Sequence, residues 1–298
     1  MLVATEAPAL PVLRELVPAG VEFRELASDP LDGVEFLIPH WSDDLRLDEM
    51  PDLRVVQVLS AGTDWIEERL PAGVTLCNAR GARDVAVAEW VVAALTGAAT
   101  GLLRCAREHA AHDWTRFQPA EVAGSTVLIL GLGSIGQAVR RRLEALRAQV
   151  IGVAREPRPG VHGIDDLPDL LPTADAVVVL TPLTDETRGM VDAAFLAALR
   201  DGALLLNAGR GAVVATDALV AELQSGRLRA VLDVVDPEPL PADHPLWDAP
   251  GLLALTPHVA GDTQAAEDRA LRFAGHQVAR YARGEPLRNV VQSNVRAT

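Results

Sequence analysis

The fold is decided by the stretch T-V-L-I-L-G-L-G-S-I-G at residues 126–136, in which an apolar run leads directly into a glycine turn. Residues 137–146 follow with the apolar spacing of a helix. A G-x-G-x-x-G turn that leaves a strand and opens a helix is typical of dinucleotide-binding βαβ units. Glycine turns are common, so the flanking strand and helix are what make this pattern a strong signal.

Each position of the turn has a physical task. Gly131 permits the tight turn, Gly133 lets a pyrophosphate approach the backbone, and Gly136 lets the helix pack closely on the strand. The N–H groups of Ser134 and Ile135 lie where a helix begins and would point at phosphate oxygens. We therefore expect these five residues to bind the cofactor.

The composition limits the classes of partner. The chain has 298 residues, enough for two domains of about 100 to 200 residues each. Its net charge of -14 argues against nucleic acid as a partner, because binding to a phosphate backbone needs a basic face. The sequence contains no lysine, so a lysine Schiff base is excluded and anions must be held by arginine, backbone N–H groups or helix N-termini.

The cysteines and the first residues indicate the cellular setting. Cys77 and Cys105 form no C-x-x-C pair, so we expect two buried thiols in a reducing compartment and no metal site. Residues 1–6 show no basic segment followed by an apolar run, and no stretch approaches the ~20 apolar residues of a membrane span. The sequence thus favours a cytoplasmic protein with no membrane partner.

Short apolar runs alternate with helical patterns along the chain, which favours parallel sheets built from βαβ units. In the first part we expect a helix at Pro11 to Leu16 and strands at 1–4, 21–26, 34–38, 55–59 and 75–78. In the second part we expect strands at 126–130, 150–154, 176–180, 203–207, 230–234 and 252–256. These six strands fit a doubly wound dinucleotide fold.

Two helical patterns connect the parts. The Ala-rich residues 85–109 predict one long helix that bridges two domains, and residues 263–283 predict a helix that returns to the first domain. The sequence therefore predicts an α/β protein in which a Rossmann domain is inserted into a substrate domain. The expected boundaries are 1–90 plus 263–298 for the substrate-binding domain and 91–262 for the NAD(P)-binding domain.

The end of the second strand of the nucleotide domain bears on the choice of cofactor. An NAD enzyme usually places a carboxylate there for the ribose 2'-hydroxyl, but this position is Ala154. Without that carboxylate a 2'-phosphate is not repelled, and Arg155 and Arg158 can bind it. NADP is favoured over NAD, with two alternatives: Arg155 is a solvated surface charge, or it stacks on the adenine, and Glu156 would oppose a phosphate.

Three separated residues follow predicted strands of the nucleotide domain: Arg210, Glu238 and His258. Open α/β sheets bind ligands at the carboxyl ends of strands, so these side chains are expected to converge. His258 can donate a proton near neutral pH, and a carboxylate such as Glu238 would favour its protonated form. Arg210 can hold a substrate carboxylate with two hydrogen bonds, while Asp233 is placed to accept from a nicotinamide carboxamide.

With these residues the chain resembles the D-isomer-specific 2-hydroxyacid dehydrogenases, which include glyoxylate/hydroxypyruvate reductases, formate dehydrogenase and phosphoglycerate dehydrogenase. The resemblance runs from Ser60 to the end, and the first 59 residues fit by length and pattern only. In chain order the matching motifs are Leu59-Ser60-Ala61-Gly62-Thr63-Asp64, Val87-Ala88-Glu89, the glycine turn, Thr181-Pro182-Leu183-Thr184 with Thr187, Asn207-Ala208-Gly209-Arg210-Gly211, Leu232-Asp233-Val234 with Glu238-Pro239, and Thr256-Pro257-His258. Several motifs in the right order are far more specific than any one of them.

The resemblance implies a mechanism and a set of site residues. Ser60, Ala61 and Gly62 with Arg210 would bind the carboxylate of a 2-keto acid, and the pair of His258 and Glu238 would protonate the oxygen as hydride arrives, giving a D-2-hydroxy acid. It also implies a flavodoxin-like substrate domain that closes on the nucleotide domain, and a homodimer. Further cofactor-binding positions would be Val87, Thr181, Pro182, Thr187, Ala208 and Gly261.

The chain departs from the family pattern near its substrate-binding motif. Arg80 and Arg83 occupy positions often filled by Pro and by a small or amide residue. They would recognise a second anionic group of the substrate, or they are surface residues that cap the long helix. Trp41 is either a wall of the substrate pocket or an ordinary, partly buried aromatic residue.

Two other functions share this fold. One is a nucleotide-sensing binding protein, like the transcriptional corepressors of the family, which retain Arg210, Glu238 and His258. The other is oxidation of an anion such as formate or phosphite. Formate oxidation needs no proton donor, so the presence of Glu238 with His258 favours carbonyl reduction.

Overall fold

The computed structural model describes residues 1–28, 30–42 and 44–293. By internal contacts the chain divides into two compact units. Unit 1 comprises residues 1–83 and the chain from Asp262 onward, and unit 2 comprises residues 84–261. The domains expected from the sequence are defined by what they bind, and that assignment stays a prediction.

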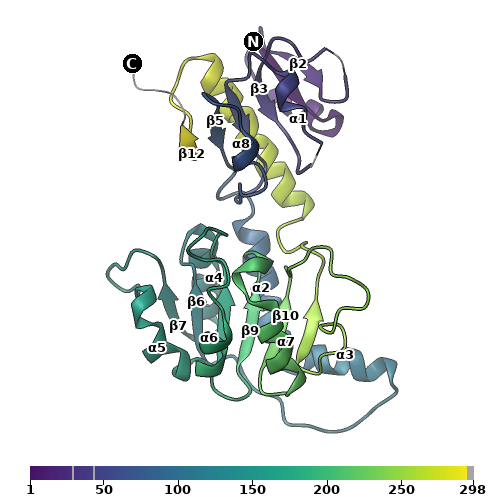
Figure 1. Cartoon of the computed structure of the whole chain (residues 1–298), viewed down its shortest axis with the longest axis vertical. Helices are drawn as coiled ribbons and strands as arrows, with labels where there is room; N and C mark the ends of the chain where they lie inside the picture. Colours follow the sequence, from purple (N-terminus) through teal and green to yellow (C-terminus); the bar gives the residue numbers. More distant parts are fainter. Residues whose placement is uncertain (29, 43, 294–298) are drawn as a thin grey trace. The chain divides into compact units, whose positions relative to one another are not determined.

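Unit 1 is built on a sheet with the strand order β12-β5-β4-β3-β1-β2 (Figure 1). The strands are β1 (Leu2–Thr5), β2 (Glu22–Glu25), β3 (Val34–Ile38), β4 (Val55–Gln57), β5 (Thr75–Cys77) and β12 (Val290–Ser293). All pair in parallel except β12, which runs antiparallel to β5. Strand β12 was not predicted from the sequence, because a short edge strand far along the chain from its partner carries no βαβ pattern.

Two helices cover one face of this sheet: α1 (Leu10–Leu16) and α8 (Gln264–Ala282). Their buried residues, such as Leu13 and Ala274, pack with Phe36 and Ile38 of β3. The helices approach closely, since a Cβ on Gly275 would lie 2.8 Å from the Leu16 side chain. The described part of the unit also contains 3-10 turns at Ala7–Ala9, Leu47–Glu49 and Glu67–Arg69.

Unit 2 contains a fully parallel sheet with the order β11-β10-β9-β8-β6-β7 (Figure 1). The strands are β6 (Thr126–Leu130), β7 (Gln149–Val153), β8 (Ala176–Val179), β9 (Leu204–Asn207), β10 (Arg229–Leu232) and β11 (Leu252–Leu255). His162 forms a parallel bridge with Val153 of β7, in the place of a further strand. The sheet is doubly wound, as predicted. The order in which the chain adds strands reverses between β6 and β8, which is the switch point of the sheet.

Helices cover both faces of this sheet, because alternate strand residues are buried on either side. On one face Val127 and Ile129 pack against α2 (Asp84–Ala99) and α4 (Ser134–Ala145). On the other, Leu128 and Leu130 share a core with α5 (Leu167–Leu170), α6 (Ala193–Ala198) and α7 (Thr216–Gln224). The 3-10 turns of the unit are Ile164–Asp166, Leu171–Thr173 and Gly211–Val213.

The prediction of one long helix at residues 85–109 is wrong. The structure has α2 and then α3 (Leu102–Ala110), bent by 72°. Gly101 causes the break, because its φ of +76° is a left-handed conformation that a helix cannot continue through. Within the described ranges no helix by itself is long and apolar enough to cross a membrane, and only this bent pair reaches the required length and composition together.

The two thiols differ in environment. Cys77 is buried in β5, and burial raises the pKa of its thiol to about 11. Cys105 is exposed on α3, so the expectation that both thiols are buried is wrong for this one. The helix break explains the difference, because α3 turns away from the direction of α2.

Candidate active site

The glycine turn lies at the switch point of the unit 2 sheet. Gly131 has a φ of +104°, and a Cβ there would lie 2.7 Å from the carbonyl carbon of Leu180, which follows β8. A Cβ on Gly136 would overlap the Gly131 carbonyl oxygen. The backbone itself therefore requires glycine at both positions. Gly133 is different, because a Cβ there would meet nothing within 4 Å and its φ is -78°.

The space beside Gly133 has the donors of an anion site. Helix α4 begins at Ser134 with Gly133 as its N-cap, so its first N–H groups have no intrahelical acceptor. Beside the turn, the Thr181 hydroxyl is buried and has no hydrogen-bond partner among the described residues. An open cradle, a helix N-terminus and an orphaned hydroxyl fit the phosphates of a dinucleotide.

The end of β7 carries arginines and no carboxylate at the position of Ala154. The side chain of Arg155 is 73% exposed, with a weak ion pair of 3.8 Å to Glu186. Arg158 is fixed, because its Nη2 donates to the carbonyl of Leu132 in the glycine turn at 2.9 Å. Arg155 and Arg158 both follow β7, and the last residue of that strand, Val153, is hydrogen-bonded to Gly131 of the glycine turn.

The loop after β8 is closed by Thr187. Its hydroxyl donates to the Pro182 carbonyl at 2.7 Å and accepts from the Thr184 N–H at 2.8 Å. Of the other predicted cofactor positions, Val87 is buried in α2, Ala208 is half-buried after β9, and Gly261 is the last residue of unit 2. Their positions in the fold are thus known, and their roles in binding a cofactor stay predictions.

Arg210 stands on a loop that a buried amide supports. The Asn207 side chain donates to the Arg210 carbonyl at 3.0 Å and accepts from the Gly209 N–H at 3.0 Å. The Arg210 guanidinium donates to the Gly209 carbonyl at 2.9 Å. A Cβ on Gly211 would overlap the Val235 carbonyl oxygen, so this loop touches the segment that leads to Glu238.

Asp233 organises the loop after β11. Its buried carboxylate accepts from the Thr256 hydroxyl at 2.6 Å and from the N–H groups of Val259 and Ala260, both at 2.9 Å. Its carbonyl accepts from the N–H of His258 at 2.8 Å. The predicted bond to a nicotinamide carboxamide stays a prediction. The sequence did not show that Asp233 supports residues 256–260, the histidine loop, which carries His258.

Trp90 is a second residue that sequence reasoning missed. Its indole N–H donates to the Thr256 hydroxyl at 3.1 Å, so it continues the hydrogen-bond chain that ends at Asp233. A partly buried tryptophan usually has a hydrogen-bond partner for its N–H, and this was the available signal. The partner lies 166 residues away and could not be named from the sequence.

His258 and Glu238 are hydrogen-bonded, with 3.0 Å between Nδ1 and Oε2. The other Glu238 oxygen accepts from the Val235 N–H at 3.0 Å. Partial burial raises the pKa of Glu238, but the bonds from His258 and Val235 and the charges of His258 and Arg210 outweigh it, so the pKa is lowered. His258 is held at a φ of +56°, and its side chain is half exposed. Unit 2 thus brings an ionised carboxylate, an imidazole and a guanidinium together.

In unit 1 the predicted substrate residues lie at the carboxyl ends of strands. Ser60, Ala61 and Gly62 follow β4, and the loop with Arg80 and Arg83 follows β5. Arg80 is exposed, and Trp41, after β3, is 68% exposed. Arg83 is paired with carboxylates, at 3.0 Å from Glu267 and 3.5 Å from Asp262.

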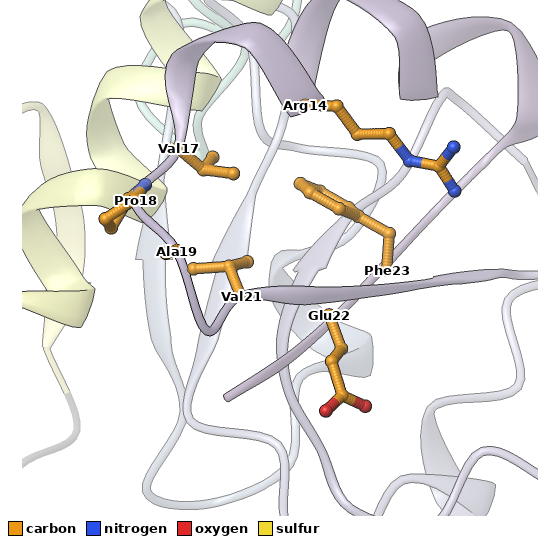
Figure 2. Close-up of a pocket in the computed structure, with 7 residues that line it drawn as sticks. All are labelled: Arg14, Val17, Pro18, Ala19, Val21, Glu22 and Phe23. Atoms are coloured by element: carbon orange, nitrogen blue, oxygen red, sulfur yellow. The ribbon is translucent and has the colours of Figure 1, made fainter.

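Two surface pockets contain none of the predicted site residues. The first, about 500 Å³, lies in unit 1 between the end of α1 and β2 (Figure 2). In Figure 2 Phe23 and Arg14 lie on one side of β2, and Glu22 points to the other. The second, about 450 Å³, is lined in unit 2 by Arg188, Asp217 and His244 among others. Neither pocket contains a hydrogen-bonded acid and base such as Glu238 and His258. The candidate active site is therefore identified by its reactive side chains and not by the size of a cavity.

Gly211→Ala should destabilise the protein by more than about 2 kcal/mol, because the new Cβ would overlap the Val235 carbonyl oxygen. The matched control is Gly133→Ala, whose Cβ meets nothing within 4 Å and which should change stability by less than about 1 kcal/mol. Urea unfolding of the purified variants measures both. Equal stability of the two variants would contradict this account of the Arg210 loop.

Comparisons with known proteins agree with this geometry. A family model described as "D-isomer specific 2-hydroxyacid dehydrogenase, NAD binding domain" matches residues 92–260. The D-3-phosphoglycerate dehydrogenase of Methanocaldococcus jannaschii is 30% identical over 256 residues, 82% of this chain and 48% of that protein. This chain thus spans about half the length of that relative.

Two other relatives match over more of their own length. The (S)-sulfolactate dehydrogenase of Chromohalobacter salexigens is 34% identical over 236 residues, 75% of each chain. The crystal structure of an NADPH-dependent glyoxylate/hydroxypyruvate reductase from Sinorhizobium meliloti, in complex with NADP and sulfate, is 30% identical, covers 98% of both chains and has a TM-score of 0.84. With the doubly wound sheet and its glycine turn, these matches mean that the chain belongs to the D-isomer-specific 2-hydroxyacid dehydrogenase family.

Proposed function

We propose that this protein reduces a 2-keto acid to a D-2-hydroxy acid with a reduced nicotinamide dinucleotide. The observation that carries the proposal is the 3.0 Å hydrogen bond between His258 Nδ1 and Glu238 Oε2, beside the charge of Arg210. Family membership supports the reaction class, and relatives named as a glyoxylate/hydroxypyruvate reductase and a (S)-sulfolactate dehydrogenase support a small acid as substrate.

Each residue has a defined task in this reaction. In unit 2, Arg210 is suited to bind the substrate carboxylate, and in unit 1 the backbone N–H groups of Ala61 and Gly62 are suited to an anionic oxygen. When bound, the reduced nicotinamide supplies a hydride to the carbonyl carbon C2. His258 gives its proton to the carbonyl oxygen, so the product is a neutral hydroxyl group. Glu238 stays ionised and stabilises the protonated imidazole before the transfer.

The acid-base pair also separates this function from the oxidation of an anion. Reduction of a carbonyl creates charge on oxygen and needs a proton donor, whereas hydride loss from formate leaves carbon dioxide and needs none. The Glu238 carboxylate is bonded to His258 on one oxygen and to the Val235 N–H on the other. That arrangement is suited to holding a proton on His258, which favours reduction.

Purified protein should oxidise NADPH in the presence of a 2-keto acid, with glyoxylate, hydroxypyruvate, phenylpyruvate and oxaloacetate as the first acceptors. His258→Ala should lower kcat by about 10²–10⁴-fold, because the general acid is lost. Arg210→Ala should mainly weaken substrate binding, because it removes a charged hydrogen-bond donor. Absorbance at the nicotinamide band measures turnover, and circular dichroism checks that the variants fold.

The contrary results point to the two other functions. Tight binding of NADPH without turnover of any acceptor would favour a nucleotide-sensing protein. Reduction of NADP with formate or phosphite, and no keto-acid reduction, would favour oxidation of an anion.

Glu238→Gln should shift the pH dependence of reduction. The wild-type carboxylate is ionised because its pKa is lowered, and its charge lies next to the imidazole of His258, with 3.0 Å between Oε2 and Nδ1. Activity that needs this charge should be lost as the pH falls through the lowered pKa of Glu238, and the variant, which cannot ionise at this position, should be less active and lack that acid limb. The profile of kcat/KM against pH tests this, with Glu285→Gln in unit 1, another carboxyl of lowered pKa, as the matched control. Coincident acid limbs and equal activity for wild type and Glu238→Gln would refute the role of Glu238.

The preferred cofactor under this proposal is NADPH. Ala154 at the end of β7 provides no carboxylate for a ribose 2'-hydroxyl, and the exposed Arg155 is available to a 2'-phosphate. Arg158 donates to the Leu132 carbonyl and so supports the turn for either dinucleotide. The homodimer implied by the resemblance stays a prediction, which light scattering of the purified protein tests.

Arg155→Ala should raise the KM for NADPH about tenfold and leave the KM for NADH nearly unchanged. Arg158→Ala should raise both, because it removes the bond to the Leu132 carbonyl. Arg141→Ala, on the exposed side of α4, is the control that removes an arginine from the same unit. Equal changes for both dinucleotides in Arg155→Ala would overturn the NADPH preference.

A further inference from the structure

The carbonyl groups of the loop after β4 are all held from the body of unit 1. Three successive carbonyls, those of Leu59, Ser60 and Ala61, each accept a hydrogen bond. Their donors are Arg83 Nε at 3.2 Å, the Ala79 N–H at 2.8 Å and the Asn78 side-chain amide at 2.8 Å, in that order. One strand-end segment, residues 78–83, thus orients three consecutive peptide groups of its neighbour.

This arrangement fixes where the N–H groups of the loop point. In a planar trans peptide the N–H points opposite to the carbonyl of the preceding residue. The N–H groups of Ser60, Ala61 and Gly62 therefore point away from residues 78–83. Within the described part of the chain none of the three donates a backbone hydrogen bond. Three successive N–H groups aimed in this way suit an anionic oxygen.

The guanidinium of Arg83 is the charged member of this support. It lies 3.0 Å from Glu267 Oε2 and 3.5 Å from Asp262 Oδ1, and its Nε donates to Leu59. The side chains of Arg83 and Glu267 are each only 20% exposed. The planar fork of arginine can serve a carbonyl and a carboxylate at once, which an ammonium group cannot do with fixed geometry.

We infer that Arg83 is a positioning residue for the substrate carboxylate and not a receptor for a second anionic group of the substrate. Two carboxylates neutralise its charge, and its Nε holds the peptide that begins the anion-binding loop. Arg80 on the same segment is exposed and remains the candidate for a second anionic group. The inference rests on the proposed function, because it assigns a task within keto-acid binding.

The test compares two keto acids and one amide proton. Glyoxylate has a single carboxylate and oxaloacetate has two, so a receptor and a positioning residue predict different kinetics. The Ala79 N–H is bonded to the Ser60 carbonyl, so its hydrogen exchange reports the loop without any substrate. The variants are Arg83→Ala and Arg83→Lys, the second of which keeps a positive charge beside Glu267 and protects the fold.

Arg46→Ala is the matched control. Arg46 also lies in unit 1, donates to a backbone carbonyl, that of Leu26, at 2.8 Å, and pairs with Glu49 at 3.1 Å. It is not bonded to the loop at residues 59–62 in the described contacts. Its loss should leave the exchange of the Ala79 amide and both KM values unchanged.

In Arg83→Ala we expect the KM for glyoxylate and for oxaloacetate to rise by the same factor, about tenfold, with kcat changed less than twofold. The Ala79 amide should exchange faster, and Arg83→Lys should be intermediate in both measurements. A rise confined to oxaloacetate, or unchanged exchange of the Ala79 amide, would overturn the inference. If wild-type protein reduces no keto acid, the proposed function fails, while the exchange measurement still decides whether Arg83 holds the loop.

Discussion

The buried carboxylate of Asp233 is the constraint on which the histidine loop depends. A charge taken out of water is costly unless its hydrogen bonds are replaced. Here the Thr256 hydroxyl and two backbone N–H groups replace them, and all three donors come from the loop after β11. Satisfying the carboxylate therefore closes that loop, and the Asp233 carbonyl then accepts from His258. The left-handed backbone of His258 is tolerated because both of its flanks are fixed.

Other charged side chains of this lysine-free chain are also hydrogen-bonded to backbone groups. Arg227 donates to the carbonyls of Leu196 and Leu199 while it pairs with Glu222, whose hydrogen bond raises the pKa of Arg227. Arg107 donates to the carbonyl of Leu252 at 3.0 Å. Arginine is suited to this use because its donors form a rigid fork and it stays charged. Although the net charge of the chain is negative, these arginines stabilise its loops through hydrogen bonds to backbone carbonyls.

The elements that were predictable are those whose signal is local. Buried parallel strands such as residues 126–130 are apolar runs, and the glycine turn follows directly, so sheet and switch point could be placed. The encounter of His258 with Glu238 was foreseeable because both follow neighbouring strands of one sheet. The break at Gly101 was not, because an isolated glycine in an Ala-rich pattern is compatible with a helix until its φ is known. The partners of Arg83 and Trp90 lie well over 100 residues away and are set by tertiary packing alone.

The contact between Gly131 and Leu180 bears on how this turn can change in evolution. Two backbone segments meet there with no volume for a side chain, so glycine is demanded by the sheet whether or not a ligand binds. A descendant that had lost its nucleotide would still be selected to keep Gly131, and Gly136 for the same reason. Gly133 faces open space and would be free to drift in such a lineage. Of the glycines in this turn, Gly133 is therefore the one whose persistence would record selection for the ligand itself.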